Sequence, residues 1–232
     1  MTAATGAPTL PRMRIDLISD VACPWCAIGL AGLQQALDQL DGEIDVELHC
    51  QPFELNPDMG PEGRDIVEYL GEKYGKSPQD IAQTQAMIRE RGAAVGFSFG
   101  PRTRTWNTFD AHRLLHWAGL QGAAAQLALK RALLQAYHGD GRNPSDAAVL
   151  ADAAEAAGLD RAAAQAVLAE GRHADEVRAA ERHWQQQGIR AVPSVVVDGR
   201  HLIQGGQPPA VYLQALRQIA AESAAEPAGA QR

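Results

Sequence analysis

The tetrapeptide Cys23-Pro24-Trp25-Cys26 lies directly between a strand-like segment and a helix-like segment. Apolar residues begin to alternate across residues 13–19, and leucines recur at three- and four-residue spacing across residues 24–40. A cysteine at the start of a helix meets unpaired backbone N–H groups and the positive end of the helix dipole, which both favour a thiolate. Cys26 follows one turn later on the same face, near enough to form a disulfide. This arrangement is typical of a redox-active dithiol.

The two cysteines of this pair are expected to have different roles. Thiol–disulfide exchange needs one thiolate that attacks and a second thiol that resolves the mixed disulfide, so we expect Cys23 to attack and the deeper Cys26 to resolve. Pro24 suits the first helical position, where a backbone N–H would be unpaired anyway. Trp25 is expected to offer a flat apolar surface beside the sulfurs. Asp20 lies just upstream, and its carboxylate is expected to oppose the Cys23 thiolate.

Zinc binding is the alternative interpretation of the cysteine pair. Zinc prefers four ligands, and this chain has no second Cys-x-x-Cys pair. His49 and Cys50 point to opposite faces of a predicted strand over residues 44–50, so they are poorly placed to complete one site. Cys50 lies on the apolar face of that strand and is expected in the core. The sequence therefore predicts no metal site here.

Two histidines, His112 and His116, have the i, i+4 spacing of metal ligands on a helix. The glutamate of a His-Glu-x-x-His protease motif is missing, because Arg113 follows His112. Satisfied or exposed histidines are the expected outcome, and His112 is a candidate for the border of the dithiol cleft.

Charge and hydropathy exclude several classes of partner. The formal net charge is −7 and the basic residues are scattered, so nucleic acid is not an expected partner. No apolar run reaches the roughly 18 residues of a membrane span. The first twelve residues lack the features of a secretory signal, and three cysteines do not make a disulfide framework. We therefore expect a cytoplasmic protein without membrane partners, with disordered tails at residues 1–12 and 221–232.

The predicted elements fall into three blocks. Residues 13–60 contain a strand–helix–strand unit, which implies a parallel pair of strands. Residues 61–187 are predicted to be an inserted helical domain, whose last helix is expected to pack on the other part. Its candidate helices are residues 62–74, 78–92, 106–118, 122–137, 145–157, 160–170 and 173–187. Residues 188–220 complete the first domain with a hairpin and a helix.

Turn and cap residues mark several of these boundaries. Ser77 and Ser145 are predicted to cap helices at their N-termini. Gly158 and Gly188 are predicted to end helices. Residues 195–197 and 201–203 are predicted to form a hairpin with the two-residue turn Asp198-Gly199.

The order of the three blocks predicts an α/β protein: a thioredoxin fold with a large α-helical domain inserted between its halves. In that architecture a proline at the entry to the later strand is commonly cis and faces the dithiol. Val192-Pro193 occupies this position, directly before the predicted strand 195–197. We therefore expect a cis bond there, with Val192 and Pro193 helping to shape the site.

Four segments of the chain carry a resemblance to a known family. They are Cys23-Pro24-Trp25-Cys26, residues 52–57 (PFELNP), residues 107–115 (NTFDAHRLL) and Val192-Pro193. Together they resemble the DsbA-like thioredoxin family, and specifically its FrnE-type subgroup of cytosolic bacterial oxidoreductases, across about residues 13–220. One segment departs from the family pattern: residues 204–208 read Gln-Gly-Gly-Gln-Pro where relatives often have Ser-Gly-Ala-Gln-Pro.

This resemblance implies a cytosolic thiol–disulfide oxidoreductase acting on protein or small-molecule disulfides. The redox-active disulfide would serve without a bound cofactor, and glutathione or a thioredoxin system would be its reducing partner, with glutathione as a possible co-substrate. The alternative on the same fold is a glutathione-dependent isomerase or transferase of the hydroxychromene-carboxylate isomerase or kappa type. Those enzymes typically have serine where this chain has Cys23. A third hypothesis is a holdase that binds unfolded peptides without exchange.

Overall fold

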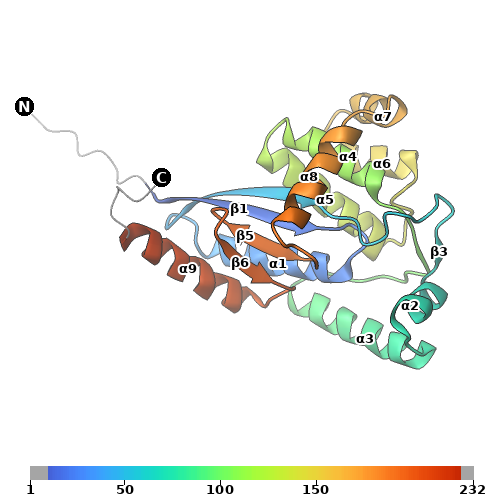
Figure 1. The fold of residues 1–232 in the computed structure, drawn as a ribbon, viewed down its shortest axis with the longest axis horizontal. Helices are drawn as coiled ribbons and strands as arrows, with labels where there is room; N and C mark the ends of the chain where they lie inside the picture. Colours follow the sequence, from blue (N-terminus) through green and yellow to red (C-terminus); the bar gives the residue numbers. More distant parts are fainter. Residues whose placement is uncertain (1–9, 226–232) are drawn as a thin grey trace, which may run out of the picture.

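A four-stranded mixed sheet lies at the centre of the fold, and helices cover both of its faces (Figure 1). The computed structural model describes residues 10–225, so the outer parts of the two predicted tails, residues 1–9 and 226–232, lie outside it. The strand order is β2-β1-β5-β6. Strands β1 and β2 are parallel, and the pairs β1–β5 and β5–β6 are antiparallel. The strands span Arg12–Ser19 (β1), Asp45–Pro52 (β2), Ser194–Val197 (β5) and His201–Gln204 (β6).

Two helices cover one face of this sheet. Helix α1 (Pro24–Asp38) makes the crossover that a parallel β1–β2 pair requires, and α9 (Pro209–Ala225) packs beside it. Ile15 and Leu17 of β1 are fully buried in the apolar core between the sheet and these two helices. The alternation of side chains along β1 therefore fixes which face receives α1 and, with it, the dithiol.

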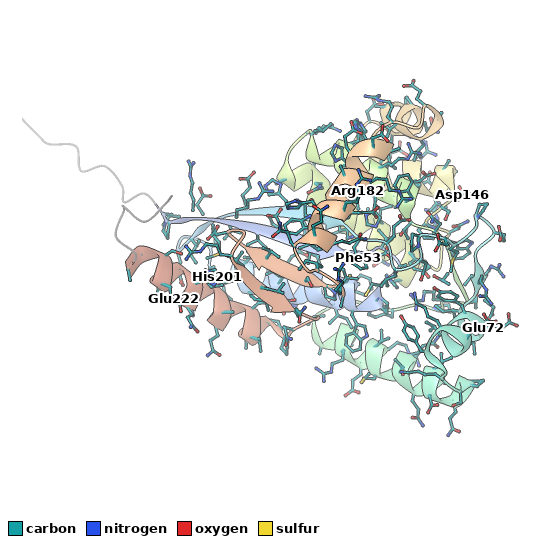
Figure 2. The ribbon with its side chains drawn as sticks, viewed as in Figure 1. Phe53, Glu72, Asp146, Arg182, His201 and Glu222 are labelled. Carbon is teal, nitrogen blue, oxygen red and sulfur yellow. The ribbon has the colours of Figure 1, made fainter. Side chains whose placement is uncertain are left out.

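The opposite face of the sheet receives α8 (Ala174–Gln186). Ile18 and Val196 pack there against Trp184 of this helix, with Phe53 beside them. Phe53 follows β2 and is labelled near the middle of the molecule in Figure 2. The last helix of the insertion thus packs directly on the sheet.

The long segment between β2 and β5 is mainly helical. Helices α4 to α7 bury a second apolar core of their own, which includes Leu114, Leu133, Tyr137 and Val167. These helices lie on one side of the sheet in Figure 1, and α2 and α3 lie at its far end from the chain termini. Their bounds are Ile66–Tyr74 (α2), Pro78–Ala94 (α3), Phe109–Gly119 (α4), Ala123–Leu134 (α5), Ala147–Ala156 (α6) and Arg161–Ala169 (α7). The predicted thioredoxin fold with inserted helices is confirmed, while the exact division into two domains stays a prediction.

One of the two predicted helix N-caps is present in the structure, and the other is replaced by a neighbouring residue. Ser77 accepts a hydrogen bond from the Asp80 backbone N–H, and the Asp80 carboxylate accepts one from the Ser77 N–H, as a capping box. Asp146, not Ser145, caps α6, because its side chain accepts hydrogen bonds from the next helical N–H groups. The Ser145 hydroxyl donates instead to the Asn107 carbonyl, 2.5 Å away.

Three other features differ from the expected pattern. Residues 62–65 are not helical: a two-residue strand, β3 (Arg64–Asp65), pairs with β4 (Arg104–Thr105) before α2 begins. The helix expected to reach residue 137 ends as α at Leu134 and continues as a π-helical turn, η1 (Gln135–Gly139). Helix α9 extends to Ala225, so residues 221–225 are helical, although they were predicted to belong to a disordered tail.

The hairpin also differs in its loop. Val197 pairs with His201, which leaves three connecting residues where two were predicted. Asp198 and Gly199 both have positive φ, of 50° and 66°, a conformation that asparagine, aspartate and glycine adopt more readily than other residues. Across residues 10–225, every helix is too short or too polar to span a lipid bilayer.

A buried glutamine joins the insertion to the edge of the sheet. The Gln126 side chain on α5 accepts from the Cys50 N–H (2.7 Å) and donates to the Cys50 carbonyl (3.0 Å) on β2. It also donates to the Leu115 carbonyl of α4 (3.1 Å). These bonds satisfy polar groups of an edge strand that water does not reach.

Replacement of this glutamine, Gln126→Leu, leaves the buried backbone groups of Cys50 unpaired. We expect the free energy of unfolding, measured by urea titration, to fall by about 2 kcal/mol. Gln121→Leu is the matched control, because Gln121 is exposed just before α5. Equal stability of the two variants would contradict a joining role for Gln126.

Candidate active site

The two cysteines of the dithiol lie at the first turn of α1. Cys23 is the N-cap residue with extended backbone, Pro24 occupies the first helical position, and the Cys26 N–H donates to the Cys23 carbonyl at 3.0 Å. Cys23 is 4 % exposed and Cys26 is 0 % exposed. The sequence reasoning therefore gave the correct order of depth, but both sulfurs are more enclosed than it implied. All three cysteines of the chain are free.

The environment separates the pKa values of the two thiols. A hydrogen bond from the Cys26 thiol lowers the pKa of Cys23 below its ordinary 9.0, helped by backbone N–H groups of Cys26 and Trp25 and opposed by burial and by Asp20. Burial raises the pKa of Cys26 well above the ordinary value, and the hydrogen bond and charge of Cys23 raise it further. The first sulfur is thus the better thiolate at neutral pH, which is what a nucleophile needs.

The third cysteine has a different environment. Burial in the core raises the pKa of Cys50 to about 11. Its neighbour His49 is only partly buried and lies 3.0 Å from Glu47. Within residues 10–225, no group of three or more histidine, cysteine, aspartate or glutamate side chains is arranged to hold a metal ion.

Asp20 connects three segments around the dithiol. Its carboxylate accepts hydrogen bonds from the Ala22 N–H (3.0 Å), the Leu55 N–H (2.7 Å) and the Thr108 hydroxyl (2.7 Å). His112 Nε2 lies 3.5 Å from the same carboxylate. Burial would raise the pKa of Asp20, but His112 and the two backbone N–H groups outweigh it and lower the pKa. The carboxylate is therefore an anion in the core, and its charge opposes the Cys23 thiolate as expected.

His112, a candidate for the border of the cleft, does not line it. It is 2 % exposed, lies against Asp20, and is absent from the residues that line the cavity above the dithiol. Its helical partner in the sequence, His116, lies instead beside His173, with ring centroids 5.1 Å apart. His112 and His116 therefore contact different residues and do not form one site.

The Val192-Pro193 loop lies across from the first turn of α1. Its peptide bond is cis, the isomer that the thioredoxin architecture favours. The Cys23 thiol points at the Val192 carbonyl, with Sγ and O 3.7 Å apart. Gly29 permits this approach, since a Cβ atom there would lie 2.9 Å from Pro193 Cγ and 3.2 Å from Gly206 Cα. Gly206 belongs to the segment that departs from the family pattern.

A cleft of about 470 Å³ opens above Cys23. Helices α2 and α3 form one wall with apolar side chains, and Trp25 and Val192 contribute from the other side. Leu55 and Asn56 also line the cleft. The Leu55 N–H donates to Asp20, and the Asn56 side chain accepts from Lys73 Nζ at 2.8 Å. Trp25 thus lies where the sequence analysis placed it, beside the dithiol and within reach of a bound molecule.

Four cationic side chains line this cleft, and no carboxylate is found among its described lining residues. Lys73 donates to Leu55, Asn56 and Tyr69. Arg102 donates to the Ala22 carbonyl (3.2 Å) and lies 3.3 Å from His138 Nδ1. Lys76 and Arg190 are exposed at the rim. Sequence analysis missed this group, because its members come from three separate segments and only the fold brings them together.

The family model described as a DSBA-like thioredoxin domain matches residues 14–217 of the chain. The protein belongs to this DSBA-like family. The structure is similar to that of a probable DsbA oxidoreductase from Streptomyces coelicolor, with 35 % identity and a TM-score of 0.84 over 93 % of this chain and 92 % of the other.

Two further proteins are similar to this DSBA-like chain at lower sequence identity. The uncharacterised protein YwbO of Bacillus subtilis is 27 % identical over 208 residues, which is 88 % of this chain and 96 % of YwbO. The cytosolic disulfide reductase DsbM of Pseudomonas aeruginosa, solved with GSH, shares the fold at 18 % identity. Its TM-score is 0.58, over 89 % of this chain and 98 % of DsbM.

The hydrogen bond from Cys26 can be tested through the pKa of Cys23. In the wild-type DSBA-like protein, alkylation of Cys23 by iodoacetamide should reach half its maximal rate below pH 9.0. Cys26→Ala removes the donor, so we expect this midpoint to rise. Cys26→Ser keeps a hydroxyl donor and should retain a lower midpoint than the alanine variant.

Mass spectrometry identifies the alkylated residue in this experiment. Cys50 does not interfere, because burial raises its pKa to about 11. A common midpoint for the alanine and serine variants would show that the Cys26 donor does not control Cys23.

Proposed function

We propose that the protein is a cytoplasmic thiol–disulfide oxidoreductase of the FrnE-type subgroup, with Cys23 as the nucleophile and Cys26 as the resolving thiol. One observation carries this proposal: a thiol of lowered pKa lies at the base of a cleft, next to a second thiol of raised pKa. Membership of the DSBA-like family supports it. The fold similarity to a cytosolic reductase supports the proposed compartment.

In the proposed reaction the Cys23 thiolate attacks one sulfur of a substrate disulfide. The substrate S–S bond breaks, its other sulfur leaves as a thiolate, and a mixed disulfide joins Cys23 to the substrate. Cys26 then attacks the Cys23 sulfur, which releases the second substrate thiolate and leaves a Cys23–Cys26 disulfide. Two electrons have passed to the substrate, so the dithiol needs no bound cofactor. A reductant such as glutathione or a thioredoxin system would regenerate it.

The cleft favours an anionic substrate. Four cations line it in a chain whose formal net charge is −7, and the two at the rim, Lys76 and Arg190, are exposed to solvent. A local positive field in a cleft concentrates molecules of opposite charge. We therefore propose that small disulfides bearing carboxylates, glutathione disulfide among them, are substrates, and that glutathione is a co-substrate.

The same cleft supports one alternative function. A glutathione-dependent isomerase or transferase on this fold would bind glutathione in a cationic cleft and activate the glutathione thiol rather than its own. Such an activity would survive Cys23→Ser combined with Cys26→Ser. A conjugation or isomerisation rate unchanged by that double substitution would favour the alternative over exchange.

The roles of the two cysteines lead to opposite outcomes on substitution. Cys23→Ser should abolish turnover of glutathione disulfide, because no attacking thiolate remains. Cys26→Ser should instead accumulate a stable mixed disulfide at Cys23, detected by intact mass. Multiple turnover by the Cys23→Ser variant would refute the assignment.

A redox titration of the wild-type dithiol in glutathione buffers provides the control for these variants. We expect a reversible two-electron couple at a potential between about −120 and −270 mV, the range of known dithiol enzymes. A pair that never forms the internal disulfide would count against the oxidoreductase.

The exposed cations at the rim should control affinity for charged substrates alone. Combined Lys76→Gln and Arg190→Gln substitutions should raise KM for glutathione disulfide about three- to fivefold and weaken its dependence on salt. KM for the neutral hydroxyethyl disulfide should stay the same. Arg182→Gln is the matched control, since Arg182 is exposed on α8 and does not line the cleft (Figure 2).

An equal rise of KM for glutathione disulfide and hydroxyethyl disulfide would contradict this prediction. It would mean that Lys76 and Arg190 shape the cleft without selecting charged substrates.

A further inference from the structure

Lys130 on α5 is a lysine buried in the core. It is 0 % exposed, and its Nζ has no hydrogen-bond acceptor within residues 10–225. Lysine is almost never fully buried without a partner, because an ammonium removed from water loses its hydration. Its position in the core therefore needs a physical reason.

Lys130 lies close to the dithiol, because Leu129 and Leu133 on either side of it in α5 pack in one buried cluster with Val21 and Ala22 of the loop that carries Cys23. Gln126 lies one turn earlier on the same face of α5 and bonds to the backbone of Cys50 on β2. The Lys130 charge acts on both neighbouring buried thiols and lowers the pKa of Cys26 and of Cys50, against the effect of burial. Lys130 does not line the cleft, so the substrate does not reach it.

The dithiol is surrounded by other charged and titratable groups from several elements. Asp20, from the loop before α1, raises the pKa of Cys23. Burial, followed by the charge of Arg102, lowers the pKa of His138 on η1 well below its ordinary value. The groups that interact with Cys26 are Asp20, Cys23, Lys130 and Tyr212. His112 lies against Asp20, and Arg102 lies beside His138.

The two thiols depend on different groups. Cys23 is favoured as a thiolate by Cys26 and by backbone N–H groups at the start of α1. Cys26 lies deeper, and its thiolate is favoured by the charge of Lys130 and by a backbone hydrogen bond at Asp20. The contribution of Lys130 can therefore be separated from the chemistry of Cys23.

We propose that Lys130 is a positioning residue for the second half of the exchange, in which its ammonium stabilises Cys26 as a thiolate. This inference rests on the proposed oxidoreductase function. Cys26 first loses its proton to water, and its sulfur then forms a bond to the Cys23 sulfur. The bond between Cys23 and the substrate sulfur breaks, and that sulfur leaves with the electron pair. The Cys26 thiolate is in turn the counter-ion of the buried Lys130 ammonium.

Reaction of the reduced protein with Ellman's reagent separates the two halves of the exchange. Attack by Cys23 releases a first coloured thiolate, and resolution by Cys26 releases a second. Stopped-flow absorbance records both phases across a range of pH. Cys26→Ser, which should show the first phase alone, identifies them.

Lys130→Met removes the charge and keeps an unbranched side chain of similar size. We expect the second phase to slow about tenfold at neutral pH, the effect of a rise of one unit in the pKa of Cys26, and to recover at higher pH. The first phase should keep its rate. Lys130→Arg, which retains a positive charge, should restore most of the second-phase rate.

Arg131→Met is the matched control, because Arg131 is the next residue of α5 and is exposed to solvent. It removes an equal charge without reaching the dithiol, so both phases should match the wild type. Lys130→Gln, which keeps a polar side chain, repeats the test should the methionine variant fail to fold.

An unchanged second phase in folded Lys130→Met or Lys130→Gln would overturn the role of Lys130. Equal slowing of both phases would also overturn it, since it would indicate a general disturbance of the site. Absence of a second phase in the wild-type protein would instead refute the proposed oxidoreductase, so the two failures are distinguishable.

Discussion

The buried carboxylate of Asp20 is the interaction on which the rest of the site depends. It binds the loop that carries the dithiol, the segment after β2 and the start of α4, three parts of the chain far apart in sequence. Without this anion, the backbone N–H groups of Ala22 and Leu55 would be unpaired in the core. The same charge disfavours a thiolate at Cys23. A group that assembles the site therefore also works against its chemistry.

The inserted helices provide side chains that act on this anion and on the dithiol. His112 comes from α4 and lies against Asp20, while Lys130 comes from α5 and acts on Cys26. Arg102 and Lys73 add cations at the cleft. None of these residues belongs to the strands and helices of the thioredoxin-like part. The insertion thus contributes to the electrostatics of the dithiol, in addition to covering the sheet and forming a wall of the cleft.

The sequence predicted the features that depend on local pattern. The dithiol at the start of α1, the N-cap at Ser77 and the hairpin near Asp198 each follow from residues a few positions apart. The strands β3 and β4 escaped prediction because two residues are too few to show a period. The π-helical turn after Leu134 has no residue pattern of its own, so the helix seemed to continue.

Long-range contacts limited prediction of the site itself. His112 was a candidate for the border of the cleft, but it lies against Asp20, which is 92 positions earlier in the chain. Lys130 did leave a signal, since it interrupts the buried stripe formed by Gln126, Leu133 and Tyr137 on one helical face. A lysine within such a stripe is a polar group that the fold must accommodate, and only the structure shows which neighbours it meets.

In the proposed exchange, the depth of Cys23 also decides which disulfides are left intact. The sulfur lies at the base of the cleft, with 4 % of the residue exposed. A structural disulfide inside a folded domain is surrounded by its own backbone and cannot descend to that level. A small molecule or an unfolded strand of another protein can enter. Under the proposed function, limited steric access to Cys23 would therefore protect the native disulfides of folded neighbours.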